Sequence, residues 1–355
     1  MLNENRIYCM ITVSAKPKVF GHLLVDVVRP GHCVACGSCV SACPVDAIKL
    51  VEETPKLVGK CTACGACYMG CPRTDHEFTE LEKQVLGRTR MPEEMCNGIV
   101  IGAYAVKALG DSLKRHVQDG GAVTAILLNQ VKAGDGAVVA GLDKEKPWLP
   151  VPVLTKEKDT IIRCAGTKYT SAPMIIALKQ AEREGLDKVA FVGTPCQIHA
   201  LRRRNNKVNT LAIGLFCMET FDYDKLMAFL REQGVDPTKV TKFEIKSGKF
   251  IARSPPDAPY EVKIRKLKEL SRPCCRVCQD YTSELADISV GNVGSPDGYS
   301  TVLIRSAKGK AALEAAEKAG LVEVKPLSDY QPGMGLVDKL ADMKKKDNVK
   351  KPLDQ

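Results

Sequence analysis

Two copies of one cysteine run constrain this chain more than any other feature of its sequence. Residues 33–44 read CVACGSCVSACP and residues 61–72 read CTACGACYMGCP, so both have the spacing C-x2-C-x2-C-x3-C-P. This spacing is typical of ferredoxins that hold two 4Fe-4S clusters, because the two-residue gaps let one tight loop supply three thiolates. A zinc ribbon or a disulfide scaffold is the alternative, but structural zinc sites use paired C-x-x-C units. The repeat therefore predicts a two-cluster iron–sulfur module.

The ligands of the two clusters follow from the way such paired runs fold. The fourth cysteine of each run ligates the cluster of the other run. The first predicted cluster is bound by Cys33, Cys36, Cys39 and Cys71. The second predicted cluster is bound by Cys61, Cys64, Cys67 and Cys43.

Length and composition limit the domain number and the compartment. With 355 residues, 45% of them hydrophobic, the chain is long enough for about two to three domains. Its 16 cysteines must stay reduced to bind iron, which indicates a cytoplasmic location. The sequence shows neither a signal-peptide pattern nor an apolar run of about 18 residues. We therefore expect no direct membrane span, and any peripheral membrane association would come through a partner.

The formal net charge of +10 must be corrected for bound clusters. Each 4Fe-4S core with its four thiolates adds about −2, so three clusters would leave about +4. The remaining basic residues form three runs, at 202–207, 263–276 and 344–351. Aromatic residues make up only 5% of the chain and do not interleave with these runs, which argues against nucleic acid as a partner. An acidic small molecule or an acidic protein fits better.

The order of expected elements indicates an α+β protein. Residues 1–90 form the ferredoxin-like domain, in which we expect a strand at 22–28, another at 47–53 and a helix after each Cys-Pro step. Residues 75–97 resemble a charged linker. From residue 97 to 338 apolar strands alternate with helical patterns, which predicts a larger mixed α/β domain. Residues 339–355 are expected to be a solvated basic tail.

A second set of cysteines lies in this larger domain. Cys196 and Cys217 each close an apolar stretch expected to be a strand, and strand ends that lie side by side would bring the two thiols together. Cys275 and Cys278 form a C-x-x-C unit that completes four ligands, although Cys274 could replace Cys275. Spacing alone leaves a third 4Fe-4S cluster and a group of buried structural cysteines equally open.

Residues 97 to about 340 resemble a known family, the β subunits of coenzyme F420-reducing hydrogenase and their relatives in F420-dependent formate dehydrogenase and F420H2 dehydrogenase. The resemblance is carried by DGGAVTAIL, GTKYTSAP, VGTPCQIHAL, LFC and RPCCRVCQDYTSELADISVGNVGS. The family pattern R-P-x-C-x-x-C-x-D implies a third cluster on Cys196, Cys217, Cys275 and Cys278. The N-terminal ferredoxin module makes the chain more similar to the component of F420H2 dehydrogenase that carries such a module than to the plain hydrogenase β subunit.

The same resemblance implies FAD as a cofactor and coenzyme F420 as the substrate. A flavin can convert between the hydride exchanged by F420 and the single electrons taken by clusters. The expected FAD contacts are residues that let the backbone approach the cofactor closely or that supply a hydroxyl, a charge or an aromatic ring. Each glycine among them also fits an ordinary turn. The expected contacts are Gly120, Gly121, Thr124, Lys168, Tyr169, Gly193, Thr194, Pro195, Gly291, Gly294 and Ser295.

Other polar residues near these segments have two interpretations each. The residues Arg202, Arg203 and Arg204 could reach the polyanionic tail of F420 or line a solvated helix face. His199 fits a packed histidine better than a proton donor. Because hydride transfer to a flavin needs no acid of its own, no catalytic acid or base is predicted.

The sequence thus predicts an F420-oxidising or F420-reducing iron–sulfur flavoprotein. Its redox partner would be an electron-accepting or electron-donating protein: a membrane complex, a ferredoxin or a pathway enzyme. A flavoprotein that uses NAD(P)H is one alternative, but the chain shows no G-x-G-x-x-G fingerprint. The β subunit of a formate dehydrogenase or hydrogenase is another, and a non-catalytic electron-relay protein is the third.

Overall fold

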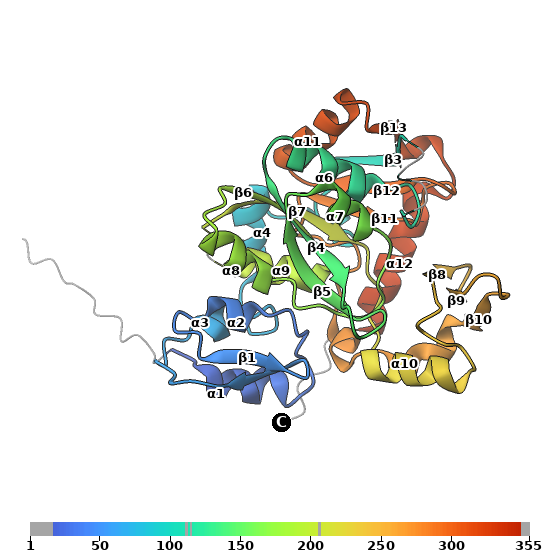
Figure 1. The fold of residues 1–355 in the computed structure, drawn as a ribbon. Coiled ribbons are helices and arrows are strands. Elements are labelled where there is room, and N and C mark those ends of the chain that lie inside the picture. The colour runs from blue at the N-terminus through green and yellow to red at the C-terminus, as the bar shows by residue number, and fades with distance from the viewer. Residues whose placement is uncertain (1–16, 111–112, 114–115, 205–206, 349–355) are drawn as a thin grey trace, which may run out of the picture.

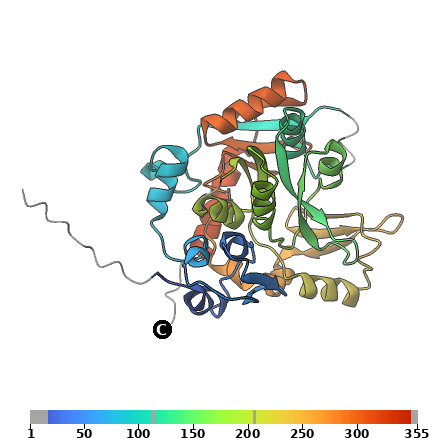
Figure 2. The ribbon, with the colours of Figure 1, turned by 60° about the vertical axis from the view of Figure 1, so that its left-hand side comes forward.

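The computed structural model describes residues 17–110, 113, 116–204 and 207–348. The N-terminal module, drawn in blue in Figure 1, packs against the lower end of the larger domain in both ribbon views (Figures 1 and 2). It contains short helices and one antiparallel hairpin in which Ile48 pairs with Leu57. Its elements are α1 (Phe20–Leu23), the π-helix η1 (Leu24–Val28), α2 (Ser38–Ala42), β1 (Ile48–Val51), β2 (Thr54–Leu57) and α3 (Ala66–Met69).

Two local expectations for this module were wrong. Residues 22–28 are helical rather than a strand, because Phe20, Leu23 and Val27 recur at helical spacing and are buried together in the core of the module. The short helices lie before each Cys-Pro step, not after it. The strand expected at 47–53 is confirmed by β1.

The two cysteine loops have the same backbone conformation. Ala35 and Gly37 in the first loop have φ values of 51° and 83°, and Ala63 and Gly65 in the second have 54° and 78°. Positive φ is uncommon for alanine, so the same left-handed step in both copies reflects a shared local constraint. The sequence repeat is therefore also a structural repeat.

The segment expected to be a linker is ordered by buried charge. It forms α4 (Phe78–Leu86) and the 3-10 turn η2 (Pro92–Glu94). Arg90 lies 2.6 Å from Glu82 and 2.6 Å from Glu284 of the larger domain, and the Glu82 side chain is fully buried. These ion pairs attach the segment to the core.

An eight-stranded mixed sheet forms the centre of the larger domain. Its strand order is β13-β3-β12-β11-β7-β6-β4-β5. The four adjacent strands β11, β7, β6 and β4 are parallel to one another. The strands outside them pair antiparallel: β12 with β11, β3 with β12, β13 with β3 and β5 with β4. The strands are β3 (Gly102–Ala108), β4 (Gly136–Leu142), β5 (Pro150–Thr155), β6 (Lys188–Gly193), β7 (Asn209–Leu215), β11 (Ile288–Gly291), β12 (Ser300–Ile304) and β13 (Val322–Pro326).

Helices cover both faces of this sheet. Side chains of α6 (Ala122–Lys132), α7 (Lys158–Arg163) and α11 (Ala307–Lys318) share one buried cluster with the strands. On the other face, α8 (Ile176–Arg183) and α9 (Pro195–Arg203) pack in a second cluster that also contains Cys36 of the N-terminal module. The predicted α+β fold is confirmed, and the module is continuous with the second core.

A smaller unit and a C-terminal helix complete the fold. The unit contains α10 (Tyr223–Glu232), β8 (Lys242–Lys246), β9 (Lys249–Arg253), β10 (Tyr260–Lys263) and the 3-10 helix η3 (Ile264–Leu270). A second 3-10 turn, η4 (Pro273–Val277), follows it. After β13 come η5 (Leu327–Asp329) and α12 (Gly333–Asp347).

The expectation of a solvated tail from residue 339 was wrong for its first part. Residues up to 347 continue α12, and Lys344 is only 2% exposed. Val337 and Ala341 on the same helix are also buried, so Lys344 lies on the face of α12 that packs into the fold. Residues 349–355 of the expected tail lie outside the described residues. Within the described part of the chain, no helix is long and apolar enough to cross a membrane.

Candidate redox centres and cofactor region

The structure brings together the four cysteines predicted for the first cluster. A hollow of about 350 Å³, part of it open to solvent, is lined by Cys33, Cys36, Cys39 and Cys71. Three of these come from the first run, and the fourth comes from the second. The apolar residues Leu23 and Val27 of the first helical segment also line this hollow, so they exclude water from one side of it.

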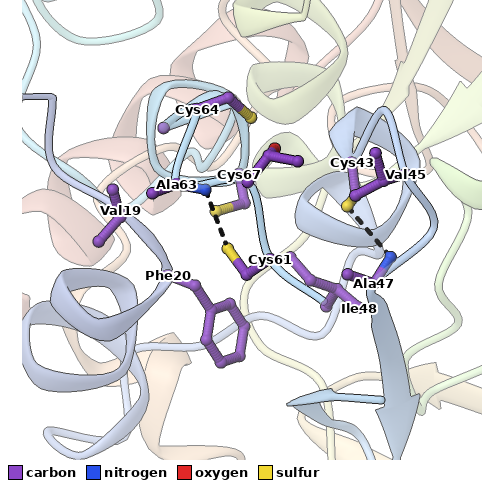
Figure 3. A pocket seen from close by; sticks show the side chains of 12 residues that line it. Val19, Phe20, Cys43, Val45, Ala47, Ile48, Cys61, Ala63, Cys64 and Cys67 are labelled. Atoms are coloured by element: carbon purple, nitrogen blue, oxygen red, sulfur yellow. Dashed lines mark hydrogen bonds between the residues drawn. The ribbon is translucent and has the colours of Figure 1, made fainter. Parts of the chain in front are cut away.

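The other predicted set lies around a second hollow of about 300 Å³. Figure 3 shows Cys61, Cys64 and Cys67 on one side and Cys43 across from them, with Phe20 alongside. Cys61 and Cys64 are exposed, whereas the ligands predicted for the first cluster are buried or half-buried. The second centre therefore lies nearer the protein surface.

Backbone amides point at the sulfur atoms of both runs. The Ala47 N–H donates to Cys43 Sγ at 3.3 Å, and the Ala63 N–H donates to Cys61 Sγ at 3.4 Å (Figure 3). Burial raises the pKa of Cys67 to about 11 and that of Cys71 to about 11, and amide donors oppose this shift at both thiols. Amide dipoles of this kind stabilise thiolate charge, as cluster ligation requires.

The third cysteine group gathers where two parallel strands end. Cys196 is the second residue of α9, directly after β6, and Cys217 follows β7 by two residues. Strands β6 and β7 are paired up to Gly193 and Gly214, which places their ends side by side. The η4 turn brings Cys275 and Cys278 to the same place, and the charges of all four cysteines act on one another.

The third group offers four sulfur donors in one region of the fold. A cubane holds its thiolates at separate corners, farther apart than the ligands of one ion. The four sulfur atoms, two of them in a C-x-x-C turn, are thus a chemically suitable donor set for 4Fe-4S.

The ambiguity between Cys274 and Cys275 is reduced by their surroundings. A hydrogen bond from the Cys274 thiol holds the pKa of Cys275 below its usual range, and the Thr220 N–H, 3.4 Å from Cys275 Sγ, acts in the same direction. The same bond to Cys275 raises the pKa of Cys274, and burial adds to that rise. Cys274 is 2% exposed within the apolar cluster of α8 and α9. Cys275 is therefore the better thiolate.

The end of α12 covers the third group, which the sequence did not indicate. Lys344 Nζ donates to the Cys217 carbonyl at 2.5 Å and to the Asp280 carbonyl at 2.8 Å. Asn348 Nδ2 donates to the carbonyl oxygens of Cys275 and Cys278. No sequence signal separated these residues from the rest of a lysine-rich segment, so only the tertiary structure reveals their role.

The three groups are arranged in a row. The Cys36 thiol lies near both Cys71 and Cys196, which connects the first group to the third. The Cys39 thiol lies near Cys71 and Cys67, which connects the first group to the second. Packing of the module against α8 supports this order, because Ile175 N–H donates to the Cys36 carbonyl at 3.0 Å. The first group is therefore the middle one.

The segments predicted to contact FAD approach one edge of the large sheet. Gly193 ends β6 and Gly291 ends β11, and these strands both run parallel to β7, so their carboxyl ends share an edge. The Ala108 N–H at the end of β3 donates to the Gly120 carbonyl at 2.6 Å. Ser295 bonds Thr301 at the start of β12 at 2.7 Å. Crevices at such edges are the usual ligand sites of open α/β sheets.

Several of the predicted contacts are already occupied by protein. A Cβ on Gly120 would lie 2.2 Å from Ser300 N, and one on Gly294, whose φ is 100°, would lie 2.6 Å from Gly333 O. These glycines are explained by close backbone packing. Thr124 is a buried residue of α6, which begins after Gly121. Thr194 caps α9 ahead of Pro195, and its hydroxyl lies 3.3 Å from Cys196 Sγ.

The GTKY segment packs inward. Lys168 Nζ donates to the carbonyl oxygens of Cys164, Ala165 and Gly166 at the end of α7. Burial lowers the pKa of Lys168 to about 8. The Tyr169 ring packs edge to face on Phe250 of the smaller unit. Neither side chain is presented to a ligand in this conformation.

The arginine run and His199 also have protein partners. Arg202 pairs with Asp287, Arg203 donates to the Cys71 carbonyl, and Arg204 pairs with Glu182. His199 Nε2 lies 2.6 Å from His76 Nε2, and burial holds the pKa of His199 well below its usual range. Arg203 and His199 contact the N-terminal part of the chain, whereas Arg202 and Arg204 pair within the larger domain, so the interpretation of a solvated face was wrong.

Comparison with known proteins agrees with this architecture. Two models describe the coenzyme F420 hydrogenase/dehydrogenase beta subunits: residues 103–179 match the model of their N-terminal part, and residues 186–330 match the model of their C-terminus. Residues 26–49 match a 4Fe-4S binding domain. The matched segments thus cover both the N-terminal module and the larger domain.

Individual relatives extend this match. The chain is 37% identical over 265 residues to the beta subunit of coenzyme F420 hydrogenase from Methanothermobacter thermautotrophicus, covering 70% of this chain and 93% of the relative. It is 31% identical over 342 residues to a component of F420H2 dehydrogenase from Methanosarcina mazei, covering 92% and 93%. A chain of the F420-reducing [NiFe] hydrogenase complex from Methanosarcina barkeri superposes with a TM-score of 0.69 at 36% identity, covering 73% of this chain and 93% of that one. The protein belongs to the family of coenzyme F420 hydrogenase/dehydrogenase beta subunits.

Proposed function

We propose that this chain exchanges hydride between coenzyme F420 and a bound FAD and conducts electrons one at a time through three 4Fe-4S clusters to a partner protein. The arrangement of three four-cysteine groups in a row carries this proposal. FAD supplies the conversion between a two-electron hydride and single electrons. The family relatives are named for F420, which identifies the substrate proposed here.

The proposed FAD region is the sheet edge where β3, β6 and β11 end. Gly193 and Gly291 end the strands on either side of β7, whose end leads to Cys217, and Gly120 lies farther along the same edge beside β3. The N-terminus of α6 after Gly121 offers free amide groups of the kind that bind phosphate. A flavin at this edge would lie on the side of the row that ends in the third cysteine group.

The proposed exit lies at the opposite end of the row. Cys61 and Cys64 of the second group are exposed, and the apolar side chains of Val58 and Met69 near them are more than half exposed. An exposed cluster with apolar neighbours suits the docking of a redox partner. We propose a cytoplasmic location for this exchange, with a membrane complex, a ferredoxin or a pathway enzyme as the partner and with either direction of flow.

The exposed cations of η3 are the better candidates for the acidic tail of F420. Lys263, Arg265, Lys266 and Lys268 are exposed, in contrast to the paired arginines of α9. Replacing Lys266 and Lys268 with Gln is expected to raise the KM for F420 and leave kcat little changed. The same replacement at the exposed Lys156 is the matched control.

An anaerobic experiment tests the whole proposal. Purified protein reconstituted with iron, sulfide and FAD is expected to hold about twelve irons per chain and to show a flavin spectrum that bleaches on addition of reduced F420. It is also expected to reduce a viologen dye with reduced F420 as the donor. Bleaching by NADH but not by reduced F420 would refute F420 as the substrate. Iron near eight per chain would refute the presence of a third cluster.

One variant separates catalysis from relay. Cys64→Ala removes an exposed ligand of the second group, so it should slow reduction of a protein ferredoxin acceptor while the flavin still bleaches with reduced F420. The occupied glycine contacts favour a second candidate, a non-catalytic electron relay. That candidate predicts no flavin bleaching in the unmodified protein, whatever the state of Cys64.

A further inference from the structure

Two cations lie against the third cysteine group from different segments of the chain. Lys344 of α12 is 2% exposed, and Arg73, directly after the second cysteine run, has a buried Nε with no hydrogen-bond partner. In the described part of the chain, neither of them forms an ion pair with a carboxylate. Lys345, the neighbour of Lys344, pairs instead with Glu284. The Asp280 carboxyl acts on the charge of Lys344 without forming an ion pair with it, and the other groups that act on this charge are cysteines.

Arg73 contacts two cysteine groups at once. Its backbone N–H hydrogen-bonds the Cys71 sulfur of the first group. Its guanidinium group is within hydrogen-bonding reach of the Cys278 thiol and close to Cys196, both of the third group. Its Nη2 also donates to the Cys274 carbonyl at 3.1 Å. One residue therefore bridges the first and third groups.

Lys344 approaches the third group from α12. Its amine donates to the Cys217 and Asp280 carbonyls, and the thiols of Cys278, Cys217 and Cys275 act on its charge together with the Asp280 carboxyl. Arg73 comes from the N-terminal module and Lys344 from the C-terminal helix, so both lie outside the matched segments 103–179 and 186–330. Both charges therefore come from segments that flank the matched part of the larger domain in the sequence.

A cation near a tetrathiolate cluster changes the relative stability of its oxidised and reduced states. A 4Fe-4S core with four thiolates carries about −2 when oxidised and about −3 after gaining one electron, and no bond forms or breaks. A nearby enclosed cation stabilises the more negative state more strongly, because its attraction is weakly screened at low dielectric. Unpaired cations beside the third group therefore favour its reduced form.

We propose that Arg73 and Lys344 are positioning residues that raise the reduction potential of the third cluster. The inference rests on the proposed function, since it requires a third cluster on Cys196, Cys217, Cys275 and Cys278. It assigns the tuning of that cluster to segments outside the family core.

The test is an anaerobic redox titration followed by electron paramagnetic resonance on the full chain. The signal of the third cluster is assigned as the one that Cys217→Ala removes. Arg73→Gln and Lys344→Gln are each expected to lower the reduced-to-oxidised ratio of this signal about tenfold at a fixed potential, which equals 59 mV for a one-electron couple. Arg73→Lys keeps the charge and should restore most of the ratio.

Matched controls separate tuning from structural damage. Lys345→Gln removes a charge on the same helix that is paired with Glu284, and Arg203→Gln removes an interface arginine that contacts Cys71 rather than the third group. Both are expected to leave the third signal at its original potential. An unchanged potential in Arg73→Gln and Lys344→Gln, with iron still near twelve per chain, would overturn the inference. Iron near eight in the unmodified protein would instead overturn the third cluster of the proposed function.

Discussion

The side-chain amide of Asn348 lies 2.8 Å from the carbonyl oxygen of Cys278, although 70 residues separate them in the chain. The same amide donates to the Cys275 carbonyl at 3.0 Å. The residue that follows α12 thus holds both ends of the C-x-x-C turn. Retention of the third cluster should therefore depend on the C-terminal helix.

Asn348→Ala is expected to loosen this turn, because it removes two hydrogen bonds to carbonyl groups of the cysteine turn. Reconstituted protein treated with an iron chelator should fall from about twelve toward about eight irons per chain. Asp347→Ala, at an exposed neighbour on α12, is the control and should keep its iron. Equal iron loss in the two variants would contradict a specific role for Asn348.

Comparison of Cys274→Ala with Cys275→Ala identifies the fourth ligand. Cys275 has the lowered pKa and the Thr220 amide donor, so Cys275→Ala should leave about eight irons per chain. Cys274→Ala should keep about twelve and cost only about 1 kcal/mol of folding stability for the lost apolar contact. Iron analysis together with thermal unfolding measures both effects. The reverse pattern of iron loss would assign the ligand to Cys274.

The ion pairs of Arg90 should contribute strongly to stability. Glu82→Gln leaves a buried guanidinium with one carboxylate fewer, and breaking a buried pair of this kind costs about 3 kcal/mol. The thermal midpoint of the apoprotein is the measurement. Glu314→Gln in the exposed Lys310–Glu314 pair serves as the comparison, with an expected cost below about 0.5 kcal/mol. Similar losses of stability in Glu82→Gln and Glu314→Gln would show that burial does not strengthen the Arg90 ion pair.

Because of Lys168, the free energy of unfolding should increase with pH in the alkaline range. Burial lowers its pKa from 10.5 to about 8, so between these values the unfolded chain binds more protons than the folded one. Its contribution to the free energy of unfolding therefore rises with pH from about 8 to 10.5, by at most about 3 kcal/mol, and is constant below pH 8. The stability of the unmodified protein relative to Lys168→Met should rise over this window.

Thermal unfolding of both proteins at pH 7.5 and pH 10, each near one side of the window, measures this difference. The exposed Lys156 provides the control through Lys156→Met, which should track the unmodified protein at both pH values. A gap between the unmodified protein and Lys168→Met that narrows as pH rises would refute the assigned sign.

Local spacing was enough to predict which cysteines of the two ferredoxin-type groups lie together. The ligand sets of the two ferredoxin-type groups were fixed by C-x2-C-x2-C-x3-C-P, and the structure gathers these cysteines around two hollows. The third set required the pairing of β6 with β7, whose apolar strands end shortly before Cys196 and Cys217. Sequence patterns fail where the apolar residues of a short segment fit both a strand and a helix. Residues 22–28 are such a segment: they were expected to form a strand, but Leu23 and Val27 are buried on one face of a helix.

The sequence by itself determined the cysteine chemistry, the α+β order of elements and the family, because each depends on residue spacing along the chain. Only the tertiary structure decided the order of the three groups and the positions of Arg73, Lys344 and Asn348 beside them. Lysines and arginines have no spacing rule that separates a solvated side chain from an enclosed one, since their environment is set by elements far away in the chain. On α12, Lys344 lies on the buried face with Val337 and Ala341, whereas Lys339 and Lys346 are exposed, and only the packing of the helix in the fold distinguishes them.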